Sequence, residues 1–258
     1  MFLYSLQIKN IYTNINKLLE DLKKDVDFYL KQEKEGIFTE THSKDATADA
    51  LGFHGTGWPW FIDVLCHLPY PDNCRQTLIN SLKHYYQGKS NELEILREFD
   101  SDYSLENAVW WYTRETFLYR ILNRALRQHN IEQMFLLGFF VKDLYLQLDK
   151  GYKKLQDMHS QNPLITVYRG QLMSSDEIDR LGMPYYTTIT NNSFLSTSLD
   201  ESVSIDFIDS STASEGFVKV QLIIELDLKK RSRPFSIIAH LSALTKENEV
   251  LFMPGTHL

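Results

Sequence analysis

The chain has little cysteine, which argues against a disulfide-stabilised fold and against a cysteine-containing zinc site. Cys66 and Cys74 are the two cysteines among 258 residues, and two thiols cannot build a disulfide framework. Together with His67 and His84 they do not fall into the paired spacing of a zinc site. The sequence therefore predicts two buried or free thiols, and no bound metal is expected.

Positive charge and long apolar runs are also scarce. The formal net charge is −7, whereas a protein that works mainly by gripping nucleic acid carries a basic excess. No apolar run approaches the length of a membrane span. Residues 1–9 lack the basic region and long apolar block of a secretion signal. We therefore expect a cytoplasmic protein with no nucleic-acid partner and no membrane span.

Helical and strand signals follow one another along the chain. Apolar residues recur at three- and four-residue steps, which predicts helices over residues 11–32, 74–86, 92–99 and, most strongly, 104–149. Residues 33–50 are polar and predict a loop. After Pro163, β-branched and aromatic runs alternate with turn residues. These runs predict strands over 165–168, 186–189, 192–197, 216–226, 235–238 and 250–253, with short helices at 174–178 and 202–208. Helices followed by clustered strands predict an α+β fold with a mixed, mostly antiparallel sheet.

Two of the predicted strands carry polar residues at informative positions. The run from Leu164 ends in Arg169-Gly170, which predicts a guanidinium at a strand end beside a residue that permits close backbone approach. In the run 193–198, strand alternation places Ser196 and Ser198 on the same face.

The last predicted strand is preceded by two carboxylates. Glu247 and Glu249 stand two residues apart before an apolar run that ends in Pro254-Gly255. On a strand they would point to one face, roughly 7 Å apart. Acidic residues are uncommon inside strands, although two solvated charges at the start of a strand would explain the pair when it is taken alone.

Taken together and in this order, Arg169-Gly170, Ser196-Thr197-Ser198 and Glu247-x-Glu249 resemble the Arg-Ser-Glu signature of mono-ADP-ribosyltransferases. The Glu-x-Glu form is similar to the arginine-specific branch of that family. The helical run 108–127 also resembles the helical subdomain that precedes the catalytic sheet in these enzymes. The resemblance implies a catalytic domain over residues 103–258, with a helical subdomain at 104–160 and an NAD-binding sheet at 163–258. Residues 1–102 form a helical region whose role the sequence leaves open.

The resemblance implies an NAD(P)-protein-arginine ADP-ribosyltransferase, a glycosyltransferase that moves ADP-ribose from NAD to arginine and releases nicotinamide. Breaking the nicotinamide–ribose bond produces an oxocarbenium-like sugar. By resemblance, Arg169 anchors the dinucleotide phosphates, and Gly170 lets backbone amides approach the nicotinamide carboxamide. Ser196 would orient Glu249. Glu249 would accept the ribose 2′-hydroxyl and stabilise the developing cation.

Glu247 has a separate implied task at the acceptor. An arginine side chain is protonated and a poor nucleophile, so a second carboxylate is needed to grip it and to take its proton. The segment 239–246 stands where this family places its substrate-recognition loop, and it does not name the acceptor protein. Phe194 shares a face with Ser196 and could flank the nicotinamide, although core packing explains it better.

Two other functions stay open from the sequence. In an NAD glycohydrolase, water would replace the guanidinium at the same site. In an inactive interaction module, the motifs would be remnants, which intact Arg169, Ser196 and Glu249 argue against. The resemblance also implies a further strand after Pro254-Gly255-Thr256, whereas the sequence ends at Leu258. We therefore expect a sheet that is short at its C-terminal end.

Overall fold

The computed structural model describes Lys17, residues 38–41 and 57–175, Ile178, and residues 188–213, 215–230, 232–243 and 248–257. The predicted helix over 11–32 lies outside these residues except for Lys17, which is helical. Of the predicted helix at 174–178, Ser174 is the last residue of a strand, Ser175 and Ile178 are helical, and residues 176–177 lie outside the described residues, as does Glu247.

The N-terminal part of the described chain is helical, as predicted. Its elements are α2 (Trp58–His67), α3 (Cys74–Tyr85), α4 (Ser90–Asp102), the short 3-10 helix η2 (Leu105–Asn107), α5 (Ala108–Thr113), α6 (Phe117–Arg127) and α7 (Ile131–Met158). The single helical stretch predicted at 104–149 is divided into several helices, and α6 and α7 each begin at a residue whose side chain caps the helix N-terminus. The Thr116 side chain accepts a hydrogen bond from the Leu118 amide, and the Asn130 side chain accepts one from the Gln133 amide. Both cysteines are free thiols, and burial raises the pKa of Cys66 to about 12.

The C-terminal part forms a five-stranded antiparallel sheet in the order β5-β2-β4-β7-β6. Its strands are β2 (Leu164–Ser174), β4 (Leu195–Ser198), β5 (Phe217–Asp227), β6 (Phe235–Ile237) and β7 (Glu249–Phe252), and helix α9 (Glu201–Ser210) follows β4. This arrangement confirms the α+β class. The prediction of a loop throughout 33–50 is wrong, because β1 (Phe38–Thr41) pairs with β3 (Thr188–Asn191) in a separate two-stranded sheet.

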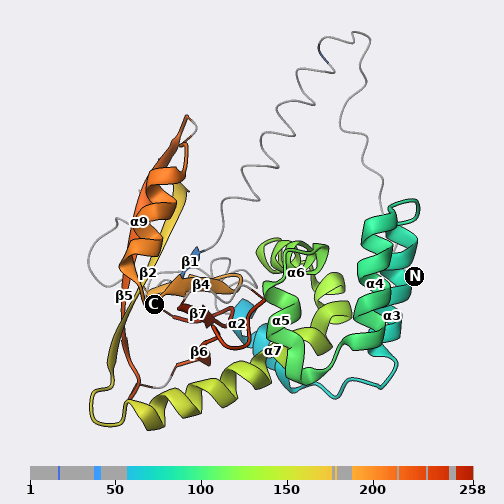
Figure 1. Ribbon diagram of the computed structural model, residues 1–258, viewed down its shortest axis with the longest axis horizontal. Coiled ribbons are helices and arrows are strands. Elements are labelled where there is room, and N and C mark those ends of the chain that lie inside the picture. The colour runs from blue at the N-terminus through green and yellow to red at the C-terminus, as the bar shows by residue number, and fades with distance from the viewer. Residues whose placement is uncertain are drawn as a thin grey trace.

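The five-stranded sheet forks at β2. Strands β2 and β5 pair along eleven residues, whereas β2 and β4 are paired at Tyr168 and Ser198. In Figure 1 the β2–β5 ribbon, with α9 beside it, runs away from the short strands β4, β7 and β6. The prediction that Arg169-Gly170 ends a strand is therefore wrong, because β2 continues to Ser174. The two residues lie in mid-strand, immediately past the point where β2 leaves β4.

Strands β4 and β7 are buried on both faces. Leu251 packs with Phe194 into the larger core, which α2 to α7 form. Val250 and Phe252 point to the other face, into a second core that includes Tyr152 of α7. Helix α7 contributes to both cores and in Figure 1 extends from the helical group to beneath β6. The strand that carries Glu249 is thus the most enclosed part of the sheet.

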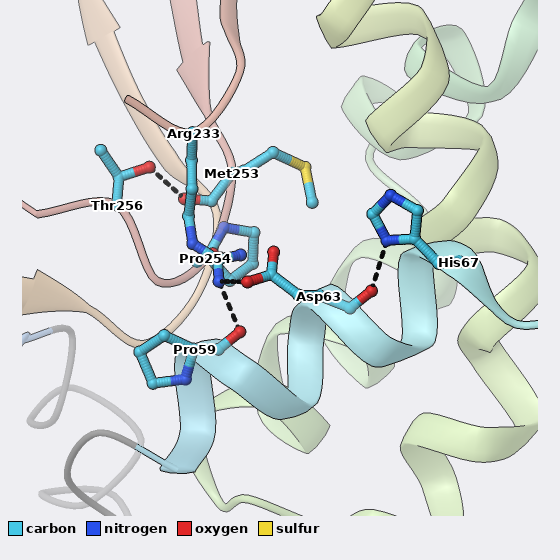
Figure 2. A network of polar contacts seen from close by, with 7 residues as sticks. All are labelled: Pro59, Asp63, His67, Arg233, Met253, Pro254 and Thr256. Carbon is cyan, nitrogen blue, oxygen red and sulfur yellow. Dashed lines mark hydrogen bonds and ion pairs between the residues drawn. The ribbon is translucent and has the colours of Figure 1, made fainter. Parts of the chain in front are cut away.

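A polar network holds the turn that follows β7 (Figure 2). Gly255 has φ 78°, a left-handed conformation that favours glycine. The Arg233 guanidinium donates to the carbonyls of Pro59 and Pro254 and forms an ion pair with Asp63 at 2.7 Å. Beyond the turn, His257 forms a backbone bridge with Thr190. The turn is thereby tied to α2 and to β3.

Replacing Arg233 with methionine should lower the free energy of unfolding by about 2–4 kcal/mol, because two carbonyls lose a charged donor. Its side chain is 15% exposed, whereas that of Asp63 is 54% exposed. Asp63→Asn should therefore cost no more than about 1 kcal/mol. Urea denaturation of both variants measures these values, and equal losses would contradict the account.

Candidate active site

Ser196 and Glu249 meet across strands β4 and β7. The antiparallel register pairs Ser198 with Glu249 and Ser196 with Leu251, so Ser196 is the diagonal neighbour of Glu249 on the same face. The Ser196 hydroxyl donates to Oε1 of Glu249 at 2.6 Å. Glu249 is 8% exposed. A carboxylate that is buried and held by a charge-assisted hydrogen bond has a fixed orientation.

Thr197 secures the same pair of strands from the other face. Its Oγ1 donates to the carbonyl of Val250 at 3.0 Å. Ser198, the register partner of Glu249, has a different hydrogen bond, because its Oγ accepts from the backbone amide of Asp200 at the start of α9. Of these neighbouring hydroxyls, that of Ser196 contacts the carboxylate.

Arg169 connects β2 to this pair across the fork of the sheet. Its Nη1 donates to the carbonyl of Ser196 at 2.6 Å, and its Nε donates to Oε1 of Gln171 at 2.9 Å. Burial lowers the pKa of the Arg169 guanidinium, while Tyr119, Tyr112 and Glu249 oppose the shift. An arginine stays protonated under such conditions. The structure therefore brings three sequence-predicted residues, Arg169, Ser196 and Glu249, to one place.

Two tyrosines of the helical layer, Tyr112 and Tyr119, lie close to Arg169. The ring of Tyr112 in α5 lies 4.9 Å from that of Phe194 and 5.3 Å from that of Tyr119, measured between centroids. Burial raises the pKa of Tyr112 well above its usual value, so its phenol stays neutral, and its oxygen accepts from Nδ2 of Asn123 at 3.0 Å. Phe194 is buried in the larger core, as the packing interpretation requires, and its contact with nicotinamide stays a prediction.

Sequence reasoning missed Tyr112, Tyr119 and Gln171. Tyr112 is one of the buried residues of α5, and an apolar repeat cannot tell a core residue from one that also faces a site, whereas Tyr119 is exposed on α6 and lies outside its buried face. Gln171 follows Arg169 by two positions. On a strand this spacing places both side chains on one face, a signal that was available once β2 was known to continue.

Gly170 has a packing role that the sequence did not indicate. A Cβ at this position would lie 2.3 Å from the carbonyl oxygen of Ser204 and 3.1 Å from side-chain atoms of Phe207 and Ile208. The missing side chain therefore lets α9 pack directly on β2. The implied approach of its backbone to nicotinamide stays a prediction.

Ala243 and Asn248, the described residues on either side of 244–247, each have a hydrogen bond to another part of the chain. The backbone amide of Ala243 donates to Oγ1 of Thr113 in α5 at 2.9 Å. The carbonyl of Asn248 accepts from the amide of Leu199 at 3.0 Å. Glu247 lies outside the described residues, so its predicted place beside Glu249 rests on the spacing in the sequence.

Neither a metal cluster nor a membrane-spanning helix is found in the part of the chain that the structure describes. No three histidine, cysteine, aspartate or glutamate side chains there gather closely enough to hold a metal ion. None of its helices is both long enough and apolar enough to cross a bilayer.

Comparisons with known proteins bear on this site. No curated protein matches the chain. Among solved structures, the chain is similar to the Vis toxin, an ADP-ribosyltransferase from Vibrio Splendidus, at 17% identity over 76% of this chain and 81% of that one, with a TM-score of 0.35. A structure of Vis in complex with agmatine is similar at 19% identity over 76% and 80% of the two chains, with a TM-score of 0.34. At this sequence identity and TM-score, the similarity does not identify the position of any site residue.

The match to a family model is stronger evidence of family membership than the similarity to solved structures. The model described as NAD:arginine ADP-ribosyltransferase matches residues 76–218, more than half of the chain. The matched span includes Arg169, Gly170 and Ser196 and stops before Glu247 and Glu249. Of these residues, Ser196 bonds Glu249 and Arg169 bonds the carbonyl of Ser196. The resemblance inferred from the motifs is thus confirmed, and the chain belongs to the NAD:arginine ADP-ribosyltransferase family.

Proposed function

We propose that the chain transfers ADP-ribose from NAD to arginine side chains of a protein acceptor and releases nicotinamide. The observation that carries the proposal is the 2.6 Å hydrogen bond from Ser196 to the buried Glu249, with Arg169 bonded to the same serine. Members of the family use NAD as their substrate. The arginine acceptor is the part of the proposal that goes beyond family membership.

Glu249 would act on the ribose of NAD. The nicotinamide leaves with the bonding electrons, so positive charge develops on the ribose carbon and its ring oxygen. A carboxylate fixed beside the sugar stabilises this charge without having to reorganise. The bond from Ser196 provides that fixed orientation, because it holds Oε1 in place before the substrate arrives.

Arg169 would hold the pyrophosphate. A guanidinium has five N–H donors in a planar fork that suits phosphate oxygens. The contacts of Arg169 with Ser196 and Gln171 use two of these donors. They also fix the plane of the guanidinium, so that a phosphate meets an oriented fork of donors.

Glu247 would select arginine as the acceptor. Two residues before Glu249, it would point to the same face if the extended backbone of β7 continues back to it. Its carboxylate could grip a protonated guanidinium in bidentate fashion and take the proton as the new carbon–nitrogen bond forms. Water has no charge to be gripped, so this carboxylate favours transfer over hydrolysis of NAD.

Agmatine, a small arginine mimic, separates transfer from hydrolysis. With NAD and agmatine, the intact chain should form ADP-ribosylagmatine, and Glu249→Gln should lower both this product and the release of nicotinamide by about 100- to 1,000-fold, the usual loss when a preorganised stabilising group is removed. Glu247→Gln should lower transfer by about 100-fold or more, the usual contribution of a general base, while nicotinamide release continues. Mass spectrometry of the product and a nicotinamide assay measure the two activities.

The control for this experiment is Glu225→Gln, which changes an exposed glutamate of β5 in the same sheet. This variant should retain both activities. Nicotinamide release without any agmatine product in the intact chain would instead identify an NAD glycohydrolase.

Removing the Ser196 hydroxyl should slow the reaction without unfolding the protein. A hydrogen bond to a charged group contributes about 1.5–3 kcal/mol, so Ser196→Ala should lower kcat for nicotinamide release by about 10- to 100-fold. Ser198→Ala is the matched control on the same strand, because its hydroxyl accepts from the backbone amide of Asp200. The account fails if the two variants lose activity equally.

A further inference from the structure

Gln171 is a buried polar residue next to the site. It lies two positions after Arg169 on β2 and is 3% exposed. The spacing places both side chains on the same face of the strand.

The contact with Arg169 fixes which way the amide of Gln171 points. Arginine has donors and no acceptor, so the atom that receives its Nε–H at 2.9 Å is the amide oxygen Oε1. The amide nitrogen Nε2 must then point away from the guanidinium. This nitrogen is buried and has no hydrogen-bond partner among the residues that the structure describes. Gln171 thus holds Arg169 with its oxygen and keeps two N–H donors unused.

A buried donor without a partner is unusual and costs folding free energy. The neighbouring strand gives a direct comparison. Gln221 of β5 has its Nε2 bonded to Oγ of Ser204 at 2.9 Å and to Oε1 of Glu201 at 3.3 Å. Its register partner is Gly170, so it lies on the opposite face from Gln171. The face of β2 that carries Arg169 is therefore the one that leaves an amide unsatisfied.

The position of Gln171 in the sheet indicates what kind of partner it lacks. Strand β2 leaves β4 after Tyr168, so Arg169 and Gln171 both lie past the fork. The hydrogen bond of 2.9 Å and the width of an amide place Nε2 within about 5 Å of Arg169 Nε. A ligand group that binds Arg169 consists of acceptor oxygens, and the neighbouring oxygens of a pyrophosphate span a similar distance. Such a ligand would supply the acceptor that the protein does not.

We propose that Gln171 is a second donor for the dinucleotide, with Nε2 binding a pyrophosphate oxygen while Oε1 holds the Arg169 guanidinium. The inference rests on the proposed function in one respect, namely that Arg169 anchors the phosphates of NAD. The unused donor is then preserved for the substrate at some cost to the stability of the free protein. The other explanation is that Gln171 acts only by positioning Arg169.

Calorimetric titration of the full chain with ADP-ribose tests the proposal. Gln171→Leu should weaken binding about tenfold, the effect of one hydrogen bond to a charged oxygen. Gln171→Glu keeps an acceptor for Arg169 and removes the donor, so it should bind ADP-ribose at least as weakly while its Tm is maintained. Nicotinamide, which has no phosphate, should bind all variants equally. Gln221→Leu is the matched control and should bind ADP-ribose within twofold of the intact chain.

A second background separates direct binding from positioning. In Arg169→Lys the charge is kept and the bond from Nε is lost. If Gln171 touches the ligand, adding Gln171→Leu to Arg169→Lys should weaken ADP-ribose binding by a further tenfold or so. No further loss would mean that Gln171 acts only through Arg169, and the proposal would be overturned. If the intact, folded chain does not bind ADP-ribose at all, the proposed function fails with it. Binding by the intact chain that Gln171→Leu leaves unchanged would overturn the role of Gln171 alone.

Discussion

The site depends on one hydrogen bond between neighbouring strands, from the Ser196 hydroxyl to the Glu249 carboxylate. A carboxylate in the interior of a sheet is costly to bury unless donors meet it. Here the register of β4 and β7 brings the serine diagonally opposite the glutamate, and cores on both faces keep that register fixed. A slip of one residue would turn Glu249 to the other face. The position of the proposed catalytic carboxylate is therefore fixed by the packing of the strands that carry it.

The rest of the fold supports this pair from three sides. The helical layer contributes Tyr112, whose ring packs on Phe194 next to Ser196. The fork of the sheet lets β2 bring Arg169 to the carbonyl of Ser196. The turn after β7 is tied to α2 through Arg233. These contacts join segments that are far apart in the sequence, so helices and sheet together form the site.

The sequence predicted which polar residues lie together better than it predicted the strands that carry them. The three motifs identified Arg169, Ser196 and Glu249, because a charged or hydroxyl group in a β-branched run stands out against its neighbours. The end of β2 was misplaced because the β-branched run was taken to end at Arg169-Gly170, whereas the strand continues and Gly170 makes room for Ser204 of α9. That close approach is a tertiary contact, and the same holds for the pairing of β1 with β3. Tyr112 was missed for a similar reason, since its ring partner Phe194 lies far away in the sequence, whereas Gln171 was missed because the strand was expected to end before it.

The most direct test of the account is a double-mutant cycle on nicotinamide release from NAD. Ser196→Ala is measured in the intact chain and again in the Glu249→Gln background. If the serine acts by orienting Glu249, its removal should have no further effect, within about twofold, once the carboxylate is gone. If Ser196→Ala lowers the rate by the same factor in both backgrounds, the two residues act independently, and the cross-strand pair is not the centre of the site.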